Sequence, residues 1–271
     1  MSGIFEEIVV RCDGMLAPAT YQQIYETAKV GGTIVEVGTA LGAGTVALAL
    51  GLQAAGRAGK VYSFDPLTGG PRRSIVEDER IAHIQANFAH FGVERLIEFV
   101  PQSLPLGMAA IPDGPVSVVM LDADGRIDRD LIAIADRLDA GASMIIDDYL
   151  DKVRVSRGRS WGTAYAIDSK MRLTYLLVEM LKRDGFISPG RVIGNTYFGE
   201  KLAELGAQID PVECLKAYRE LVFTKSHLPA FSGAMRSTMG QLERFSPSLL
   251  QKLRVLKRRN VASTPKPASA R

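Results

Sequence analysis

The sequence predicts an α/β fold in which a parallel sheet carries helices on both faces. Short runs rich in Val and Ile alternate with segments whose apolar residues recur at helical spacing. Glycines follow several of the helical segments, and most of the short runs end in a polar or acidic residue. Strands that alternate with helices form βαβ units, and a strand buried on both faces is an unbroken apolar run.

The elements are expected in the following order. A helical segment over residues 4–30 is interrupted at Asp13-Gly14 and at Pro18, since both are turn signals. Five strands with intervening helices come next. The strands are expected at 33–37, 60–64, 96–100, 116–121 and 143–146, and the helices at 45–55, 75–91 and 127–138.

The pattern changes after Tyr149. Residues 152–159 are basic and polar, residues 161–182 have helical spacing, and Phe186-Ile187 with residues 192–198 indicates a final strand pair around Ser188-Pro189-Gly190. We expect three regions, which are a ligand-binding domain over 1–200, a C-terminal helical extension over 201–262 and a disordered tail over 263–271. The tail is rich in Pro, Ala and Ser, a composition that cannot bury a core.

Composition and charge exclude several classes of protein. The 271 residues are 46% hydrophobic and 23% charged, which is ordinary for a globular protein. No stretch has the ~18 consecutive apolar residues of a membrane span, and the N-terminus lacks the basic region of a signal peptide. The two cysteines, Cys12 and Cys214, are too few for a disulfide framework. A cytoplasmic location is expected.

The positive charge is confined to the C-terminal end. The net charge is +3, but residues 252–271 contain seven Lys and Arg and no acid, so the rest of the chain carries −4. A basic tail is not evidence for a basic groove in the fold. Nucleic-acid binding is therefore not expected.

Acidic and polar residues gather at the ends of the expected strands. In open parallel sheets, ligands bind at the carboxyl ends of the strands. Acids that share one edge repel one another, so a cationic ligand or a metal ion is expected among them. The residues at these ends are Glu36, Gly38, Asp65, Gln102, Ser103, Asp122, Asp147 and Asp148.

A glycine-rich loop follows the first strand and reads Glu36-Val-Gly38-Thr39-Ala40-Leu-Gly42-Ala-Gly44-Thr45. Dinucleotide enzymes use G-x-G-x-x-G, and counted from Gly38 the second and third glycines would fall on alanines. Glu36 also faces the place where a pyrophosphate would lie. The loop therefore favours a cationic ligand over an anionic one.

The loop resembles the first motif of class I S-adenosylmethionine-dependent methyltransferases, E/D-x-G-x-G-x-G, with Ala40 at the middle glycine. The resemblance implies a Rossmann-like three-layer sandwich with a mostly parallel seven-stranded sheet and helical additions at both ends. It implies that Glu36 holds the amino-acid end of the cofactor and Asp65 the ribose hydroxyls. The full set of cofactor-binding residues that it implies is Glu36, Gly38, Thr39, Ala40, Gly42, Thr45, Asp65, Gln102, Ser103 and Asp122.

Asp122, Asp147 and Asp148 end the fourth and fifth strands, which should be neighbours. Three converging carboxylates suit Mg²⁺, Ca²⁺ or Mn²⁺. Over residues 33–152 the chain is similar to the metal-dependent small-molecule O-methyltransferases of the catechol, caffeoyl-CoA and macrocin types. That resemblance implies a small-molecule hydroxyl as the methyl acceptor.

The chain departs from those families at the general base. They place Lys or His three residues after the first metal-binding acid, where this sequence has Gly125. Asp122 and Lys152 are the candidates to take part in catalysis. His83 and His90 lie on the helix after the second strand and are poorer candidates.

Three other functions compete with this interpretation. They are a metal-free methyltransferase on the same fold, a dinucleotide-binding oxidoreductase and a non-catalytic cofactor-binding protein. The acceptor pocket is expected between the N-terminal helices and the segment after Tyr149. A homodimer through the apolar C-terminal helices is one alternative for the oligomeric state.

Overall fold

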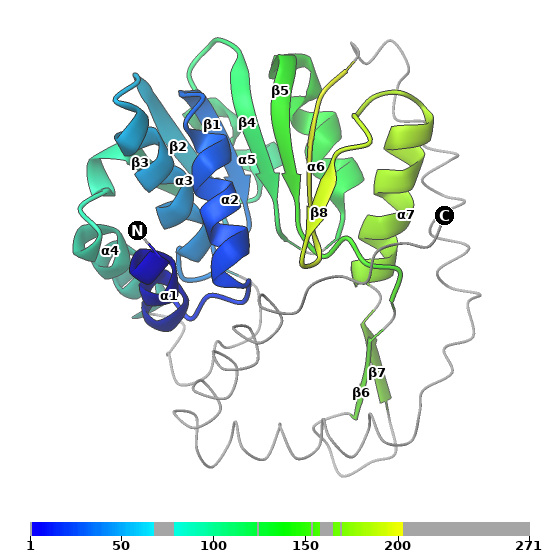
Figure 1. Ribbon diagram of the computed structural model, residues 1–271, viewed down its shortest axis with the longest axis horizontal. Helices are drawn as coiled ribbons and strands as arrows, with labels where there is room; N and C mark the ends of the chain where they lie inside the picture. The colour runs from blue at the N-terminus through cyan, green and yellow to red at the C-terminus, as the bar shows by residue number, and fades with distance from the viewer. Residues whose placement is uncertain are drawn as a thin grey trace.

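The computed structural model describes residues 2–67, 79–123, 125–152, 154–157, 165–168 and 170–202. Its centre is a seven-stranded sheet in the order β3-β2-β1-β4-β5-β9-β8 (Figure 1). The first five strands are parallel, while β9 runs antiparallel to β5 and β8 antiparallel to β9. The strands are β1 (Gly32–Val37), β2 (Gly59–Phe64), β3 (Ile97–Val100), β4 (Val116–Leu121), β5 (Leu138–Ile146), β8 (Arg191–Ile193) and β9 (Thr196–Glu200).

Helices cover both faces of the sheet, so the predicted three-layer α/β fold is confirmed. Successive strand residues point to opposite faces. Ile34 belongs to the buried core under α1–α4, whereas Val35 belongs to the core under α5–α7. The helices are α1 (Ser2–Arg11), α2 (Pro18–Ala28), α3 (Ala43–Ala55), α4 (Arg80–His90), α5 (Leu104–Gly107), α6 (Ile127–Ile134) and α7 (Lys170–Arg183).

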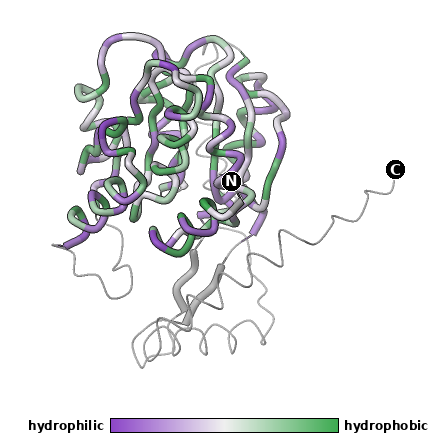
Figure 2. The backbone as a smooth tube through the Cα atoms, turned by 60° about the vertical axis from the view of Figure 1, so that its left-hand side comes forward, coloured by the Kyte–Doolittle hydropathy of each residue, from purple (hydrophilic) through white to green (hydrophobic). Residues whose placement is uncertain are grey.

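Local sequence explains where the helices near the site begin and end. Pro18 starts α2, where the missing N–H costs nothing. α3 lies between Gly42 and Gly56, both in the left-handed conformation that glycine tolerates. α3 is apolar and mostly buried because it packs between the sheet and α2. Figure 2 shows apolar stretches running through the sheet and the helices that pack on it.

The structure corrects the start of one predicted helix and the end of another. The helix expected over 161–182 starts only at Lys170, and Tyr165–Asp168 forms strand β7, antiparallel to β6 (Arg154–Arg157). Val155 pairs with Ile167 in this two-stranded sheet, and such β-branched residues favour strands. The helix expected over 127–138 is an α-helix to Ile134 and continues as a 3-10 turn over Ala135–Arg137; β5 then begins at Leu138, which pairs with Val116.

The last strand pair turns at a different place from the one expected. The turn between β8 and β9 contains Gly194, at φ +66°, and Asn195, rather than Ser188-Pro189-Gly190. Of the helical extension expected over 201–262, the structure describes only Lys201, which forms a β-bridge with Ile187, and Leu202; the rest of the extension and the tail lie outside the described residues. Within the described part of the chain, no helix is both long and apolar enough to cross a membrane.

Candidate cofactor and metal site

The register of three parallel strands brings the predicted residues to one edge of the sheet. Val37 of β1 pairs with Leu121 of β4, and Leu121 pairs with Ile146 of β5. The hydrogen bonds continue one residue further, since Asp122 N donates to Val37 O at 2.8 Å and Asp147 N donates to Leu121 O at 3.0 Å. The residues that follow β1, β4 and β5 therefore lie side by side.

The glycine loop after β1 is held in a conformation that two of its glycines make possible. Gly38 has φ +101°, and a Cβ there would lie 1.9 Å from the backbone oxygen of Asp122. Gly42 has φ +89°, and a Cβ there would lie 2.6 Å from the Phe88 ring. Both positions exclude a side chain, because such contacts are far inside van der Waals distance.

Ala40 occupies the left-handed region at φ +53° without being glycine. This conformation costs an L-residue roughly 1–2 kcal/mol. The Ala40 amide donates to Asp65 Oδ2 at 2.9 Å, which fixes the loop against the end of β2. Ala40 thus holds a left-handed conformation at the position of the motif's middle glycine.

Glu36 is wholly buried behind this loop. Its Oε2 accepts hydrogen bonds from Thr45 Oγ1 and Ser63 Oγ, each at 2.5 Å, while Thr39 Oγ1 lies 2.6 Å from Ser63 Oγ. Its Oε1 is buried and has no hydrogen-bond partner among the described residues. Burial raises the pKa of Glu36 to about 7 against the lowering effect of the two hydroxyls. An unpartnered buried carboxylate oxygen is suited to a cationic group.

Ser63 and Gly44 complete this cluster and were not among the predicted site residues. Ser63 is the small polar residue in the run Val61–Phe64, two positions before Asp65, and this spacing was an available signal. A Cβ on Gly44 would lie 2.4 Å from Glu36 Oε1. Gly44 therefore leaves the space that the Glu36 carboxylate fills.

Asp65 is held between two backbone amides at the end of β2. Oδ2 accepts from Ala40 N, and Oδ1 accepts from Leu67 N at 2.8 Å. Each carboxylate oxygen keeps a further lone pair for a ligand hydroxyl. Gln102 and Ser103 follow the neighbouring strand β3; Gln102 is exposed, and Ser103 stands at the N-cap of α5 without a capping side-chain bond.

A pocket opens beside the glycine loop. One wall comes from the connection between α1 and α2, for which the sequence indicated only a turn. This wall places Asp13 at the same pocket as Glu36 and Asp122. Tyr21 OH accepts a bond from Leu16 N at 3.3 Å and so fixes the connection. The lining residues are Cys12, Asp13, Gly14, Met15, Leu16, Tyr21, Glu36, Gly38, Thr39, Ala40, Ala43, Gly44, Met120 and Asp122.

The three predicted metal-binding aspartates converge next to this pocket. Asp122, Asp147 and Asp148 each offer a carboxylate oxygen, and these oxygens lie within 4.8 Å of one another. Burial raises the pKa of Asp147 well above its usual range, and the charges of Asp122 and Asp148 add to this effect. A hard oxygen donor set of this kind fits a divalent cation, which would favour the ionised carboxylates.

Residues of the β8–β9 turn and of β9 orient two of these carboxylates. Thr196 Oγ1 donates to Asp147 Oδ1 at 2.6 Å, and Asn195 Nδ2 donates to Asp148 Oδ1 at 3.1 Å. Asp148 itself has φ +58°, which turns the chain sharply after β5. Neither Thr196 nor Asn195 was predicted as a site residue. Both lie far from Asp147 and Asp148 in the sequence, and the pairing of β9 with β5 brings them close.

Lys170, at the start of α7, directs its ammonium into the aspartate cluster. Its Nζ lies 2.8 Å from Asp148 Oδ2 and 3.4 Å from Asp122 Oδ1. Burial by itself lowers the pKa of Lys170, but the charges of Asp122 and Asp148 outweigh it and hold that pKa above the usual range. Lys152, the predicted proton acceptor, lies on exposed chain after β5 and stays a prediction.

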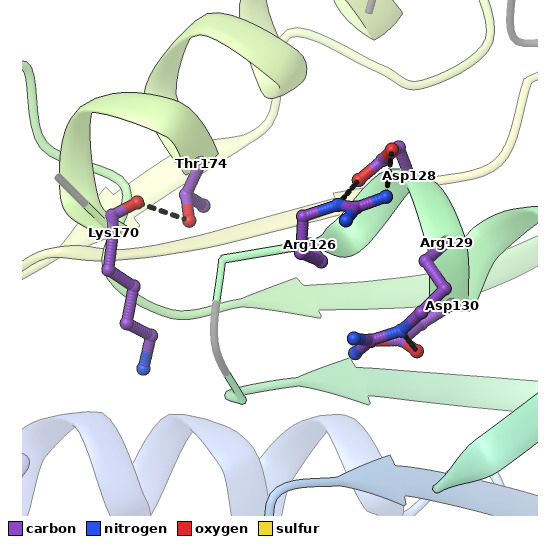
Figure 3. A network of polar contacts seen from close by, with 6 residues as sticks. All are labelled: Arg126, Asp128, Arg129, Asp130, Lys170 and Thr174. Atoms are coloured by element: carbon purple, nitrogen blue, oxygen red, sulfur yellow. Dashed lines mark hydrogen bonds and ion pairs between the residues drawn. The ribbon is translucent and has the colours of Figure 1, made fainter. Parts of the chain in front are cut away.

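Figure 3 shows Lys170 extending from the first turn of α7, with Thr174 bonded to its backbone oxygen. The nearby arginines at the start of α6 are engaged by other acids: Arg126 Nε lies 3.1 Å from Asp128 Oδ1, and Arg129 Nε lies 2.9 Å from Asp130 Oδ1. Among the described residues, Lys170 is therefore the cation that forms ion pairs with Asp122 and Asp148.

Comparisons with known proteins agree with this geometry. Residues 35–149 match the sequence model of a family described as "Methyltransferase domain". No curated protein shows significant similarity to the chain.

Solved structures of the same fold have low sequence identity. The cofactor-bound Rv0187 from MTB is 17% identical with a TM-score of 0.50, covering 72% of this chain and 88% of that one. A Klebsiella pneumoniae protein, assigned provisionally as an O-methyltransferase, is 13% identical with a TM-score of 0.52, covering 74% and 90%. An SAH-bound methyltransferase from Podospora anserina is 14% identical with a TM-score of 0.52, covering 70% and 81%. The family model over residues 35–149, the sheet order and the loop after β1 agree with one another, so this part of the chain is similar to a methyltransferase domain and has the fold of the solved methyltransferases.

Proposed function

We propose that this protein transfers a methyl group from S-adenosylmethionine to a hydroxyl oxygen of a small molecule, and that a divalent metal ion takes part. The observation that carries the proposal is the placement of two acidic sites at one edge of the sheet. Glu36 and Asp65 frame the glycine loop, and the aspartate cluster of Asp122, Asp147 and Asp148 follows the two adjacent strands. Cofactor and acceptor would thus meet across Asp122, which belongs to both sites.

The cofactor side is suited to a positively charged nucleoside. Oε1 of Glu36 is buried and lacks a partner among the described residues, so a cationic ammonium or sulfonium group would satisfy it. Asp65 is already fixed by two amides and can still accept from ribose hydroxyls. Because Asp65 is held in place before the cofactor binds, it would help to align the methyl group with the acceptor. Such alignment supplies much of the rate of displacement reactions.

The acceptor side would use Asp122, Asp147 and Asp148 as metal ligands. When bound, a divalent ion orients the acceptor hydroxyl and lowers its pKa. Thr196 and Asn195 hold two of the carboxylates in place by hydrogen bonds. The O-methyltransferase assignment of the Klebsiella pneumoniae protein supports a hydroxyl acceptor.

The test measures cofactor binding and turnover separately. Calorimetry with S-adenosylhomocysteine reports binding, and transfer of a labelled methyl group to a panel of catechols and other hydroxylated compounds reports turnover with Mg²⁺ or with EDTA. We expect EDTA and Asp147→Asn to abolish turnover while binding persists. Absence of binding at millimolar cofactor would refute the methyltransferase proposal, and full turnover in EDTA would refute the metal.

A metal-free methyltransferase is the second candidate, and Lys170 favours it. The ammonium already supplies a positive charge to two of the three carboxylates. In that case the acids would orient the acceptor through hydrogen bonds alone. Turnover in EDTA that is lost in Asp122→Asn would support this alternative.

A further inference from the structure

The side chain of Lys170 occupies the space beside Gly125. Gly125 has φ +85°, and a Cβ at this position would lie 3.1 Å from both Cγ and the backbone oxygen of Lys170. The stem of Lys170 therefore passes over the residue that, by position, would have carried the family's Lys or His. A Cβ at 125 would press on Lys170, and the φ of +85° would strain an L-residue there.

The Lys170 ammonium also lies where a cation is required. It is within 2.8 Å of Asp148 and 3.4 Å of Asp122, and the cluster oxygens are within 4.8 Å of one another. The Lys170 side chain is 24% exposed, and those of Asp122 and Asp148 are 16% and 12% exposed, so water screens these charges only in part. Three carboxylates without a cation would repel one another strongly at such distances.

We propose that Lys170 is an internal counter-cation of the aspartate cluster, which a divalent ion must displace in order to bind, so that Lys170 sets the metal affinity of this site. The inference rests on the cluster of the proposed function and deepens it. Lys170 is here a positioning residue, because it acts through Asp122 and Asp148. Its placement compensates for Gly125 by bringing the amine from α7 rather than from the loop after β4.

The physical consequence is a competition between two cations. When a site is free for only a fraction of the time, the apparent dissociation constant of its ligand equals the intrinsic constant divided by that fraction. If Lys170 is engaged about nine-tenths of the time, its removal tightens metal binding roughly tenfold. Removal also leaves the metal-free cluster with one more unbalanced charge, so the protein without metal becomes less stable.

The experiment titrates Mn²⁺ into the full chain and measures free Mn²⁺ by electron paramagnetic resonance, with no acceptor or cofactor present. We expect Lys170→Met to bind Mn²⁺ on the order of tenfold more tightly than the wild type. Its thermal midpoint should fall in EDTA and recover with Mn²⁺. Lys60→Met is the matched control, because it removes the same charge from a surface pair with Glu98.

A second measurement uses the wild type alone and does not depend on the variant folding. Acylation of lysine amines, followed by mass spectrometry, should modify Lys170 faster with Mn²⁺ than in EDTA, while Lys60 stays unchanged. Equal or weaker Mn²⁺ binding by Lys170→Met, or labelling of Lys170 that ignores Mn²⁺, overturns the inference. S-adenosylhomocysteine binding, measured by calorimetry on separate aliquots of the same proteins, shows independently whether the methyltransferase proposal stands.

Discussion

Replacing Glu36 by glutamine should change how the stability of this protein depends on pH. Glu36 is buried, accepts two hydroxyl hydrogen bonds on Oε2 and leaves Oε1 without a partner among the described residues. Glutamine has the same shape, keeps an acceptor oxygen for Thr45 and Ser63, and does not ionise. The substitution therefore removes the charge with little change in packing.

The magnitude follows from the pKa of Glu36, which rises from an ordinary 4.5 to about 7 because the carboxyl is buried. The native state then binds the proton more tightly than the unfolded state between these two values. Stability from this group is present below pH 4.5 and is lost as the pH rises through about 7. At ~1.4 kcal/mol per pKa unit, the loss is about 3 kcal/mol.

The assay is urea unfolding followed by circular dichroism at intervals from pH 4.5 to pH 8, without cofactor. We expect the free energy of unfolding of Glu36→Gln, relative to the wild type, to rise by about 3 kcal/mol over this range. Glu98→Gln, which removes an exposed carboxylate from β3, controls for net charge. A difference between Glu36→Gln and the wild type that stays constant with pH would refute the reasoning.

Three further substitutions test the loop around the cofactor pocket. Ala40→Gly should raise the free energy of unfolding by about 0.5–1 kcal/mol, because relief of the left-handed alanine exceeds the entropy that glycine adds to the unfolded chain; urea unfolding with no gain would contradict this. Gly44→Ala should destabilise by about 1–3 kcal/mol, since its Cβ would press on the pinned Glu36 carboxylate; an unchanged urea midpoint would show that the carboxylate can move aside freely. Asp65→Ala should weaken S-adenosylhomocysteine binding by about tenfold or more in calorimetry, because the loop loses its anchor along with the ribose acceptor; wild-type affinity would exclude the role of Asp65.

Much of the fold and of the site edge could be predicted from spacing alone. Short runs rich in apolar residues define β1, β2 and β4, and an aspartate follows both β2 and β4 at the strand end. Parallel strands in register then place these ends together whatever the loops do. This is why the sequence suffices to assign Asp122 and Asp147 to one site.

The spacing of apolar residues did not predict the secondary structure of short segments correctly, because their structure depends on pairing with a strand elsewhere in the chain. Residues 165–168 have apolar residues compatible with a helix or a strand, and pairing with β6 decides for the strand. Pairing of Leu138 with Val116 in β4 likewise ends the helical segment at Arg137, one residue before the predicted end.

The sequence by itself determined the alternation of β1 to β5 with helices, the glycine-rich loop after β1 and the row of acids, because each depends on local backbone preference and on residue periodicity. Only the tertiary structure decided which side chains meet those acids. Ser63 reaches Glu36 across 27 residues, and Lys170 reaches Asp122 across 48. No local pattern encodes such contacts, because they depend on how neighbouring strands and α7 pack against the finished sheet.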